Sequence, residues 1–426
     1  MNILKEKGIF AFICSNKFIK TQYGEKLREL ILNNQFTIYD DLTGHKVFKE
    51  AQVDTCVIQI KKSFDEQNQI YVNNTFFIEQ SSLNSNSFTF KHPKIFKLRE
   101  KILNGSTLIK DLDIEINRGI LTGLNEVFII DEKMKNDLIK QDSKNKNLIV
   151  PILRGRDITK WKIWDKNLYL IHSINGINLE KEYPALYKYF LKFEESLKKR
   201  GDKGKFWYNL RPCKYDSDFV KEKIVYSTIS TEPCFIYDNQ GYYLNNSAYF
   251  MISNSLNLKY LNSLLTSDLL FWYFKDIGTD YGGKAHPYRK IYIEQLPIKL
   301  TTPELENEIT DLVDTMIKSN KELITHINNF HSILKEKYRI NKLSKKLENY
   351  YELSLDEFFV EIKKSKVNIK NKNIKESLLS DYEINIGLIN KKQDEINNLD
   401  SKINRIIYGI YNLTEDEINL IENQIN

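Results

Sequence analysis

The sequence predicts an α/β protein in three parts: the margin of a larger sheet, a mixed α/β domain and a C-terminal helical region. Three observations predict this order. An apolar run followed by helical spacing begins the chain, short strand-like runs separated by glycine-containing loops fill its middle, and charged segments with helix caps and heptad spacing end it. We expect the boundaries at 1–65, 108–300 and 301–426, with a connector at 66–107.

The first 65 residues predict one helix and three strands. GIFAFICS, at 8–15, is a continuous apolar run of the kind found in buried parallel strands. Leucine and isoleucine side chains at 27–31 share one face of a helix, and the segments 36–42 and 53–62 predict two further strands. Because one helix and three strands cannot bury both faces of a parallel-type sheet, we expect this segment to be the closing edge of a larger sheet.

Residues 66–107 are rich in Asn, Ser and Gln, which predicts a polar, irregular connector. The second domain begins near residue 108, where LIKDLDIEINRGILTGLNEVFIID contains short strand runs around glycines. Further strand-like runs follow, and a helix at 258–278 ends at Gly278, which suits the C-cap position. The loop TDYGGKAHPYRK (279–290) then leads into IYIEQLPI.

From about residue 302 the pattern becomes helical and highly charged. A threonine before proline at 302–303 suits a helix start, and capping boxes at 354–357 and 414–417 mark two later starts. Isoleucines repeat every seven residues from 389 to 410. Such a short repeat predicts packing of helix on helix rather than an independent coiled coil.

The composition is that of a folded globular chain. Hydrophobic residues make up 41% of it, and no apolar run approaches the ~18 residues needed to span a bilayer. GIFAFIC is too short and too abruptly polar afterwards for a signal peptide, so we expect a cytoplasmic protein without a membrane segment. Four cysteines without a C-x-x-C pair predict reduced, mostly buried thiols and no metal site.

Positive charge is concentrated in residues 151–214, which hold fifteen Lys and Arg against seven Asp and Glu, although the whole chain carries only +6. Three of the four tryptophans lie in the same window: Trp161, Trp164 and Trp207. Clustered cations interleaved with aromatic residues predict a nucleic-acid surface, and a solvated basic face is the structural alternative. The tryptophans themselves are more often core residues than base contacts.

Several of these stretches together resemble the C-terminal part of TaqI-like adenine-N6 DNA methyltransferases, including the type IIG restriction-modification enzymes. GIFAFICSNKFIKTQYGEKLRELIL resembles the later strand and helix of their methyltransferase domain, and LTGHKVFKEAQVDTCVIQIKK the hairpin that follows. NRGILTGLNEVFIID, PILRGRDITKW and YGGKAHPYRKIYIEQLPI are similar to landmarks of their target-recognition domain. The resemblance covers about residues 1–300. It implies a partial Rossmann-like methyltransferase sheet edge at 1–65 and a TaqI-like target-recognition domain at 108–300.

The resemblance implies a role for Phe48, which stands on the loop between the second and third expected strands. In this family the target adenine is flipped out of the duplex, and an aromatic side chain at the matching position packs against it. Base flipping costs a few kcal/mol, and aromatic stacking offsets ~1–3 kcal/mol of that cost. The alternative is a local apolar contact of Phe48 with Val47 or Val53.

Two motifs that the family needs for methyl transfer do not occur in the sequence. One is a strand followed by a glycine-rich turn and an acidic residue, for S-adenosylmethionine, and the other is an N-P-P-Y type turn, for the adenine amino group. GDKGKF at 201–206 follows no apolar strand. We therefore expect no catalytic and no cofactor-binding residue in this chain alone. S-adenosylmethionine would serve the complete enzyme, formed with an upstream methyltransferase chain or a missing N-terminal half.

A nuclease site is a weaker prediction. Asp356, Glu361 and Lys363 have the residue order of a metal-dependent DNA cleavage site. Their segment has the pattern of an amphipathic helix behind a capping box, whereas such sites are usually built on strands. We therefore expect a solvated helix face there.

Candidate DNA contacts lie in three loops and in the basic window. Arg154 and Arg156 flank Gly155 in a tight turn, and we expect one of the two arginines to pair with guanine or clamp a phosphate. The alternative is an ion pair with Asp157. The other candidates, most of them for phosphates, are Arg118, Thr122, Lys160, Lys198, Lys199, Arg200, Lys203, Lys205, Lys284, His286 and Arg289.

The sequence thus predicts the part of a type II adenine-specific DNA methyltransferase or restriction-modification protein that recognises a sequence in double-stranded DNA. A stand-alone specificity subunit, like those of type I systems, is one alternative, and it predicts a self-sufficient fold for residues 1–65. An inactive remnant is another, and it predicts weak, salt-sensitive binding without sequence preference.

Overall fold

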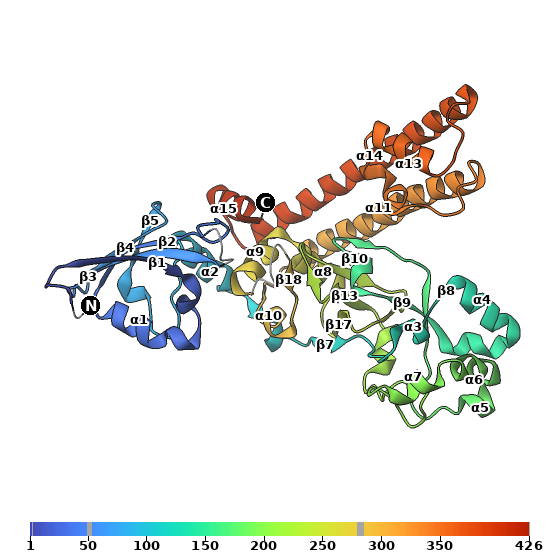
Figure 1. Cartoon of the computed structure of the whole chain (residues 1–426), viewed down its shortest axis with the longest axis horizontal. Coiled ribbons are helices and arrows are strands. Elements are labelled where there is room, and N and C mark those ends of the chain that lie inside the picture. The colour runs from blue at the N-terminus through green and yellow to red at the C-terminus, as the bar shows by residue number, and fades with distance from the viewer. Residues whose placement is uncertain (2, 49–52, 279–284, 426) are drawn as a thin grey trace. The chain divides into compact units, whose positions relative to one another are not determined.

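The computed structural model describes residues 1, 3–48, 53–278 and 285–425. The chain divides into two compact units, Met1–Asn104 and Gly105–Asn426. Figure 1 labels their helices and strands. The first unit thus includes the 66–104 segment as well as the 1–65 segment expected from the sequence.

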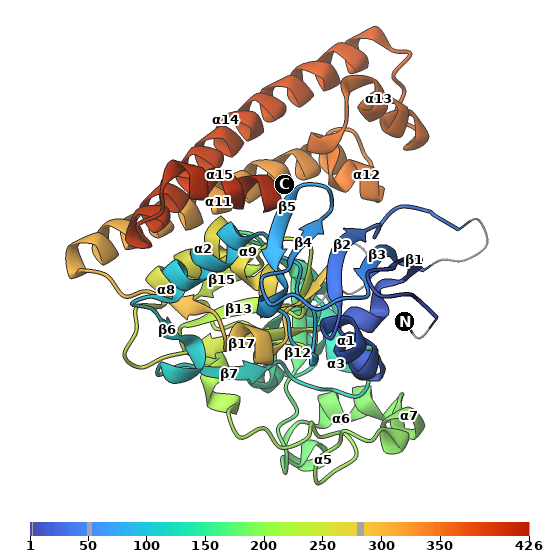
Figure 2. The same cartoon turned by 90° about the vertical axis from the view of Figure 1, so that its left-hand side faces the viewer.

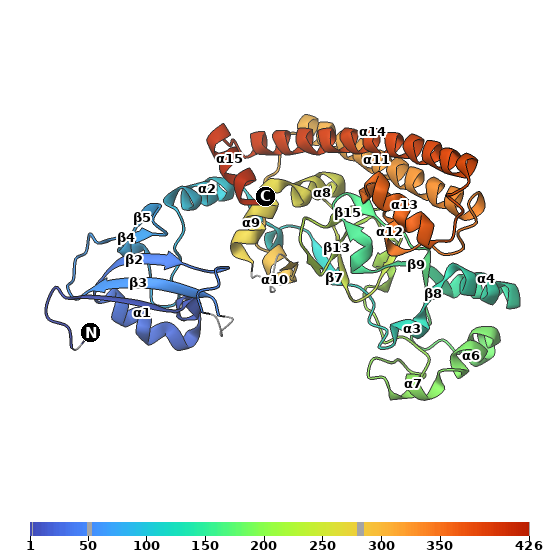
Figure 3. The same cartoon turned by 45° about the horizontal axis from the view of Figure 1, so that its top comes forward.

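A five-stranded sheet forms the centre of the first unit, in the order β1-β3-β2-β4-β5. β3 pairs antiparallel with both β1 and β2, and β2 runs parallel to β4. Helix α1 lies beneath this sheet in Figures 1 and 3. The elements of the unit are β1 (Ile9–Ser15), α1 (Glu25–Leu32), β2 (Gln35–Asp41), β3 (Thr55–Lys61), β4 (Gln69–Val72), β5 (Phe76–Glu79) and α2 (Pro93–Leu103).

The expectation of an irregular connector over residues 66–107 is wrong, because this segment supplies β4, β5 and α2. Its polar side chains satisfy buried backbone groups instead of lining a loop. The buried Gln80 amide donates to the carbonyl oxygens of Leu32 and Asn34 at 3.1 and 2.8 Å, and accepts from the backbone N–H of Phe36 at 2.8 Å. Asn68 donates to the carbonyl oxygen of Phe36 at 2.7 Å. Composition alone does not distinguish such internal amides from those of a solvated loop.

β1 is an antiparallel outer strand rather than the buried parallel strand that its apolar run predicts. Three of its apolar side chains are exposed: Ile9 by 58%, Phe10 by 37% and Phe12 by 54%. The core of the unit lies elsewhere, around Phe36 and Ile31, and residues of the 66–104 segment complete it. Residues 1–65 therefore do not close a core by themselves.

Two four-stranded sheets, ordered β15-β13-β17-β7 and β16-β9-β12-β8, form the first part of the second unit. One large apolar core joins them. The strands are β6 (Thr107–Leu108), β7 (Glu115–Arg118), β8 (Ile129–Asp131), β9 (Ile149–Leu153), β10 (Ile158–Thr159), β11 (Lys162–Ile163), β12 (Leu168–Ile171), β13 (Lys223–Ser227), β14 (Ile229–Ser230), β15 (Phe235–Asp238), β16 (Tyr243–Leu244), β17 (Ala248–Ile252), β18 (His286–Pro287) and β19 (Pro297–Ile298). The helices are α3 (Asn125–Phe128), α4 (Glu132–Gln141), α5 (Leu179–Glu182), α6 (Pro184–Leu191), α7 (Glu194–Lys199), α8 (Leu258–Thr266), α9 (Asp268–Ile277) and α10 (Lys290–Ile293).

The single helix expected at 258–278 is two helices, α8 and α9. Ser267 separates them with an extended backbone, and its hydroxyl accepts from the N–H of Leu270 as the N-cap of α9. Gly278 is the C-cap residue of α9, as predicted. A serine inside an apolar helical pattern can therefore mark a second helix start.

The C-terminal helical region is confirmed. Its helices are α11 (Pro303–Glu336), α12 (Lys345–Glu348), α13 (Leu355–Lys364), α14 (Lys372–Ile410) and α15 (Glu415–Ile425). The long helices α11 and α14 lie side by side in Figures 1 and 2, and Ile389, Ile396 and Ile403 of the heptad repeat are buried. The N-cap at Thr302 and the capping boxes at Ser354 and Thr414 form as predicted.

No helix in the described ranges is both long enough and apolar enough to cross a membrane.

Candidate nucleic-acid interface

A turn at residues 245–247, between β16 and β17, holds two arginine-bearing loops in place. The Asn245 side-chain oxygen accepts from the backbone N–H and the hydroxyl of Ser247, at 3.1 and 2.6 Å. The Ser247 hydroxyl in turn accepts from the backbone N–H of Gly155 at 2.8 Å. The backbone N–H of Asn245 donates to the carbonyl oxygen of Leu153 at 3.0 Å. The loop that follows β9 is thereby fixed to this turn.

Gly119 and Gly155 pack against the same turn so closely that neither position has room for a side chain. A Cβ at Gly119 would overlap the carbonyl oxygen of Asn245, and a Cβ at Gly155 would overlap that of Ser247. Glycine is required where two backbones approach in this way. The loops that carry Arg118 and Arg156 are therefore anchored to one turn, although the sequence indicated two separate contact points.

Arg154 and Arg156 have different environments. The Arg154 guanidinium pairs bidentately with the buried Asp157 carboxylate, with Nε to Oδ2 at 2.9 Å and Nη2 to Oδ1 at 2.8 Å. Arg156 is exposed, and no described residue forms an ion pair with it. Of the two arginines, Arg156 is thus the one that is accessible to DNA, and the ion pair considered as the alternative is the role of Arg154.

Burial corrects two further candidates. Thr122 is 1% exposed, and its hydroxyl donates to the Asn125 side chain at 2.7 Å and accepts from the N–H of Leu124 at 3.2 Å. His286 is 8% exposed and lies edge-on to the rings of Phe271 and Phe274. Neither side chain is presented for a DNA contact, because each is committed to the packing of its own loop.

The Lys160 side chain, which is one fifth exposed, is engaged by two carboxylates. Its ammonium group lies 2.8 Å from the Asp400 carboxylate and 3.2 Å from that of Asp268, and the neighbouring Trp161 indole donates to Asp400 at 2.7 Å. Burial alone would lower the pKa of Lys160, but the two carboxylates outweigh it and the pKa is raised. Lys160 and Trp161 therefore connect the β10–β11 hairpin to α9 and α14.

Part of the positive charge of residues 151–214 is buried inside the protein. Arg200 is 6% exposed, donates to the backbone carbonyl oxygens of Thr122, Trp207 and Asn209, and lies over the Phe128 ring. Burial lowers the pKa of its guanidinium to about 10. Arg200 therefore holds loops together rather than serving a phosphate. Lys198 pairs with Glu194 at 2.7 Å.

The remaining candidates are exposed. Arg118, Lys203, Lys205 and Arg289 all lie on the surface; the ammonium of Lys203 donates to the carbonyl oxygen of Lys198 at 2.6 Å. Lys284 lies outside the described residues. The exposed cations thus come from several loops of the second unit.

A hollow of about 540 Å³, not predicted from the sequence, lies beside the Arg118 loop. It is lined by residues 119–121 and 210–216, and Arg211 and Lys214 are exposed at its edge. On its wall, His172 Nε2 lies 2.8 Å from Asp216 Oδ1. The signal in the sequence is RPCK at 211–214, which ends the basic window and which we did not single out.

Phe48, in the first unit, is 42% exposed, and Val47 beside it is 39% exposed. The ring is therefore not buried by a local apolar contact. Residues 49–52, on the far side of it, lie outside the described ranges.

The described segments after β1 and before α1 lack the glycine-rich turn that S-adenosylmethionine needs in the family that the sequence resembles. β1 ends at Ser15 and is followed by a short 3-10 helix over Asn16–Ile19 rather than a glycine-rich turn. The backbone of Gly24, which precedes α1, is closed off because a Cβ there would overlap the carbonyl oxygen of Phe18. Within the described residues, no three His, Cys, Asp or Glu side chains gather as a metal site would require.

Three known families match separate parts of the chain. Residues 150–298 match the TaqI-like C-terminal specificity domain, residues 1–48 match the Eco57I restriction-modification methylase, and residues 302–407 match a domain of unknown function (DUF8810). The resemblance drawn from the sequence is confirmed: the chain is related to the type II restriction-modification methyltransferases and carries a TaqI-like specificity domain.

Individual relatives come from the same class. The Type II methyltransferase M.BstVI of Geobacillus stearothermophilus is 22% identical over 388 residues, covering 80% of this chain and 66% of that protein. The restriction enzyme and methyltransferase RM.Eco57I of Escherichia coli is 22% identical, covering 67% of this chain and 34% of its own length. M.BanIII of Aneurinibacillus aneurinilyticus is 22% identical, covering 74% and 65%. The chain thus spans less than two thirds of the length of each of these relatives.

Two solved structures are also similar. The type IIG restriction endonuclease BpuSI has a TM-score of 0.40 and 13% identity, covering 73% of this chain and 42% of its own. The type IIL restriction-modification enzyme MmeI, solved in complex with DNA, has a TM-score of 0.43 and 13% identity, covering 91% and 50%.

Proposed function

We propose that this chain is the sequence-recognising part of a type II adenine-specific DNA methyltransferase or restriction-modification enzyme, and that it acts on double-stranded DNA. The observation that carries the proposal is the attachment of two exposed arginines, Arg118 and Arg156, to a single rigid turn. The Arg156 loop and this turn both lie in the segment that matches a TaqI-like specificity domain.

Arg118 and Arg156 suit the reading of bases because their loops are held by backbone contacts. Arginine pairs bidentately with guanine in the major groove, and such a contact discriminates between bases by about 1–3 kcal/mol. A rigid attachment lowers the entropic cost of that contact. The exposed Lys203, Lys205 and Arg289 serve phosphates, and they set affinity and register without reading sequence.

Phe48 is proposed as the platform for a flipped target adenine. Its support is the exposure of the ring on the β2–β3 loop, together with its place in a segment that resembles the family's hairpin. A base that leaves the duplex loses its stacking partners, and an exposed aromatic ring replaces one of them.

Methyl transfer in this proposal requires S-adenosylmethionine and polypeptide that supplies the two absent motifs. The exposed apolar side chains of β1 and two leucines of α1, Leu27 and Leu30, suit the docking of that polypeptide, because an unpaired apolar sheet edge is otherwise a site of aggregation. The polypeptide is a separate methyltransferase chain or a preceding half of a longer protein. The complete enzyme is proposed to be cytoplasmic.

The test is selection of bound duplexes from a random-sequence library by the full chain, followed by affinity measurements at several salt concentrations. We expect one enriched motif that contains adenine and binds at least ~10³-fold more tightly than random duplex. Enrichment of no motif, with binding that depends only on salt, would overturn the proposal and indicate the inactive remnant. If the selected motif binds as tightly as expected but contains no adenine, the proposal of adenine specificity is wrong and the proposal of sequence recognition stands.

A further inference from the structure

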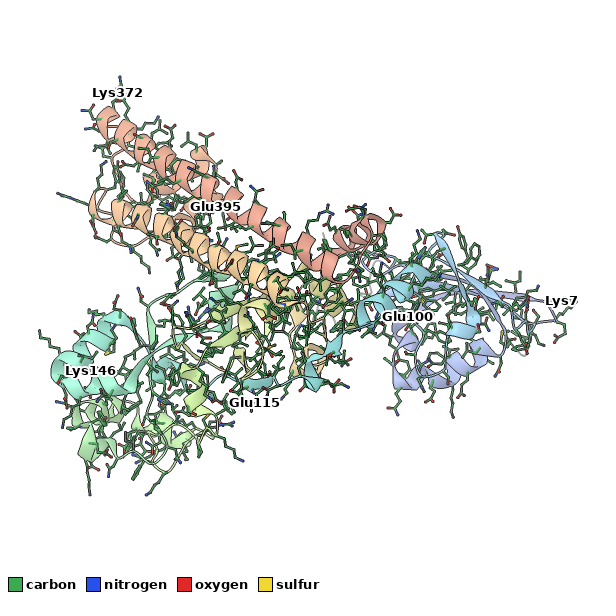
Figure 4. The ribbon with its side chains drawn as sticks, turned by 180° about the vertical axis from the view of Figure 1, so that it is seen from behind. Lys7, Glu100, Glu115, Lys146, Lys372 and Glu395 are labelled. Atoms are coloured by element: carbon green, nitrogen blue, oxygen red, sulfur yellow. The ribbon has the colours of Figure 1, made fainter. Side chains whose placement is uncertain are left out.

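The far end of the long helical pair is strongly basic. We define the basic tip as the segments 335–346 and 363–375, which link α11 to α12 and α13 to α14. They hold twelve Lys and Arg and one acidic residue, Glu336, a net charge of +11, whereas the whole chain carries +6. Figure 4 places Lys372 at the end of α14 that forms this tip, with Glu395 farther along the helix. The matching family gives this region no function.

A cavity of about 920 Å³ opens within the basic tip. Five of its lining residues are cationic and none is acidic: Lys337, Arg339, Lys342, Lys364 and Lys366. Lys337 is paired with Asp381 at 2.6 Å and Lys364 with Glu361 at 2.7 Å. The other three are exposed, and no residue in the described part of the chain forms an ion pair with them.

Helix stability explains only part of this charge. Lys335 lies in the last turn of α11 and Lys364 ends α13, where cations complement the negative end of a helix. Arg339 and Lys366 lie beyond those ends. Lys372 begins α14 at its positive end without an acidic residue in the first turn, and its ammonium group lies 3.8 Å from the exposed Glu376 carboxylate. Cations are unfavourable at that end, and clustered like charges repel. An anionic partner would offset both costs.

A second cavity, of about 960 Å³, is lined both by residues of the basic tip and by Arg156. Asn341 and Lys342 line both cavities. The second cavity also includes Arg156, together with the exposed Lys166 and Lys335. Five acidic residues line the same cavity: Asp165, Glu232, Glu348, Glu352 and Asp400. The Arg156 loop and the basic tip therefore meet in one cavity of the second unit, and the lining of that cavity is mixed in charge.

We propose that the basic tip is a second DNA-binding surface, which contacts the phosphates of the duplex that flanks the recognition sequence. The inference rests on the proposed function, because it takes duplex DNA as the partner of the Arg156 loop. A phosphate backbone is the anion that fits a long cationic surface without a defined stereochemical pocket, since such contacts are independent of sequence. Each strand adds a phosphate about every 3.4 Å, so a flank of a few turns supplies many partners.

The experiment compares the full chain with a triple variant, Arg339→Gln, Lys342→Gln and Lys366→Gln. A control on the long helices α11 and α14, Lys318→Gln, Lys391→Gln and Lys402→Gln, removes the same charge from exposed positions outside both cavities. Affinities are measured for duplexes of about 15 and about 40 base pairs that share a central sequence, at several salt concentrations. Taking the ratio of variant to wild-type Kd at each length removes the statistical advantage of a longer duplex.

We expect the triple variant to lose affinity for the longer duplex by on the order of tenfold, with a salt dependence shallower by about 2–3 units of logarithmic slope, since each phosphate contact contributes about 0.9. Its affinity for the shorter duplex, its circular dichroism spectrum and its Tm should match those of the wild type. The control should match the wild type on both duplexes.

Three results would overturn the inference. They are an unchanged affinity of the triple variant for the longer duplex, an equal loss on both lengths, and stronger competition by single-stranded RNA than by the long duplex at equal phosphate concentration. Failure of the wild-type chain to bind either duplex would instead contradict the proposed function itself, so the two failures are distinguishable.

Discussion

Arg154 and Arg156 show how two identical residue types, two positions apart, take different roles. The sequence predicts correctly that both lie in a tight turn and that an ion pair with Asp157 is possible. It does not indicate which arginine forms the pair, because that depends on how β9 and the 245–247 turn orient the loop. The same limit applies to Thr122 and His286, whose burial depends on residues distant in sequence.

Substitution of each arginine separates the two roles. Arg156→Ala should weaken binding to the selected motif by about 1–3 kcal/mol, or roughly 5- to 150-fold, with an unchanged Tm. Arg154→Ala should lower the free energy of unfolding by about 2–3 kcal/mol, because the buried Asp157 carboxylate loses its partner. Fluorescence anisotropy and thermal unfolding measure the two effects. Lys188→Ala, an exposed lysine on α6, is the control for loss of charge. A lower Tm for Arg156→Ala than for Arg154→Ala would contradict this assignment.

Phe48→Ala tests the stacking role in the reconstituted enzyme. Loss of the ring should leave duplex affinity nearly unchanged and slow methylation by on the order of 5- to 150-fold, as expected for the loss of about 1–3 kcal/mol of stacking. The fluorescence of 2-aminopurine at the target position reports the flipped base and should fall. Phe64→Ala is the matched control, because Phe64 is an exposed phenylalanine of the same unit. Equal methylation rates and equal fluorescence for Phe48→Ala and wild type would show that Phe48 does not stack on the flipped base.

At the scale of single elements, local sequence signals predict helices well and loops poorly. The C-terminal caps are predicted correctly because their interactions lie within a few residues along the chain. The burial of the heptad isoleucines is predicted correctly because their spacing follows the period of a helix, although the helix α11 that packs on α14 is distant in sequence. The prediction of a connector at 66–107 is wrong because Gln80 and Asn68 bond to backbone groups of the preceding segment, which composition cannot reveal. The prediction that β1 is a buried parallel strand is wrong in both burial and direction, because an apolar run does not specify which strands lie beside it.

The β10–β11 hairpin shows how a presumed DNA-contact element instead serves packing. Lys160→Gln should leave the Asp268 and Asp400 carboxylates facing each other without their cation. Since these side chains are a fifth to a quarter exposed, we expect a loss of about 1–3 kcal/mol in the free energy of unfolding, less than for a fully buried pair. DNA binding at the Arg156 loop should weaken only to the extent that a fraction of the variant protein is unfolded. A stable variant with lower affinity would show that Lys160 contacts DNA after all.

The same lysine gives a pH dependence. Because the pKa of Lys160 is raised in the fold, its stabilisation is fully present below its ordinary pKa of 10.5 and is lost as pH rises through the raised value. The difference in free energy of unfolding between wild type and Lys160→Gln should therefore be constant from pH 8 to about 10 and shrink above that. Chemical denaturation at each pH measures it. A difference that grows with pH would contradict the ion-pair assignment.

For the molecule as a whole, charge is separated into two basic regions on an acidic background. The window 151–214 has a surplus of eight cations and the basic tip a surplus of eleven, so the remaining residues carry a net charge of −13 against the total of +6. The first region was evident from composition alone, because three of the four tryptophans lie in the same segment as the clustered Lys and Arg. The second passed unnoticed in the sequence, since lysines at helix ends are ordinary and only the fold brings the two segments together around one cavity.

The absence of both methyl-transfer motifs from these 426 residues gives a prediction for the chain as a whole. With S-adenosylmethionine and the selected duplex, the chain alone should transfer no methyl group above background, whereas addition of a polypeptide that carries both motifs should restore transfer. Incorporation of a radiolabelled methyl group measures this. The catalytic polypeptide alone is the control. Turnover by the chain alone would contradict the prediction.

The two glycines that meet the 245–247 turn have a consequence for how such proteins diversify. Gly119 and Gly155 carry the fit between the backbones. The Arg118 side chain also donates from Nε to the carbonyl oxygen of Asn246 at 3.4 Å, whereas the exposed Arg156 forms no ion pair with a described residue. Under the proposed function, a single replacement at Arg156 would change the preferred target without disturbing this framework. Descendants of this chain can therefore acquire new specificities by small genetic steps, provided that both glycines are retained.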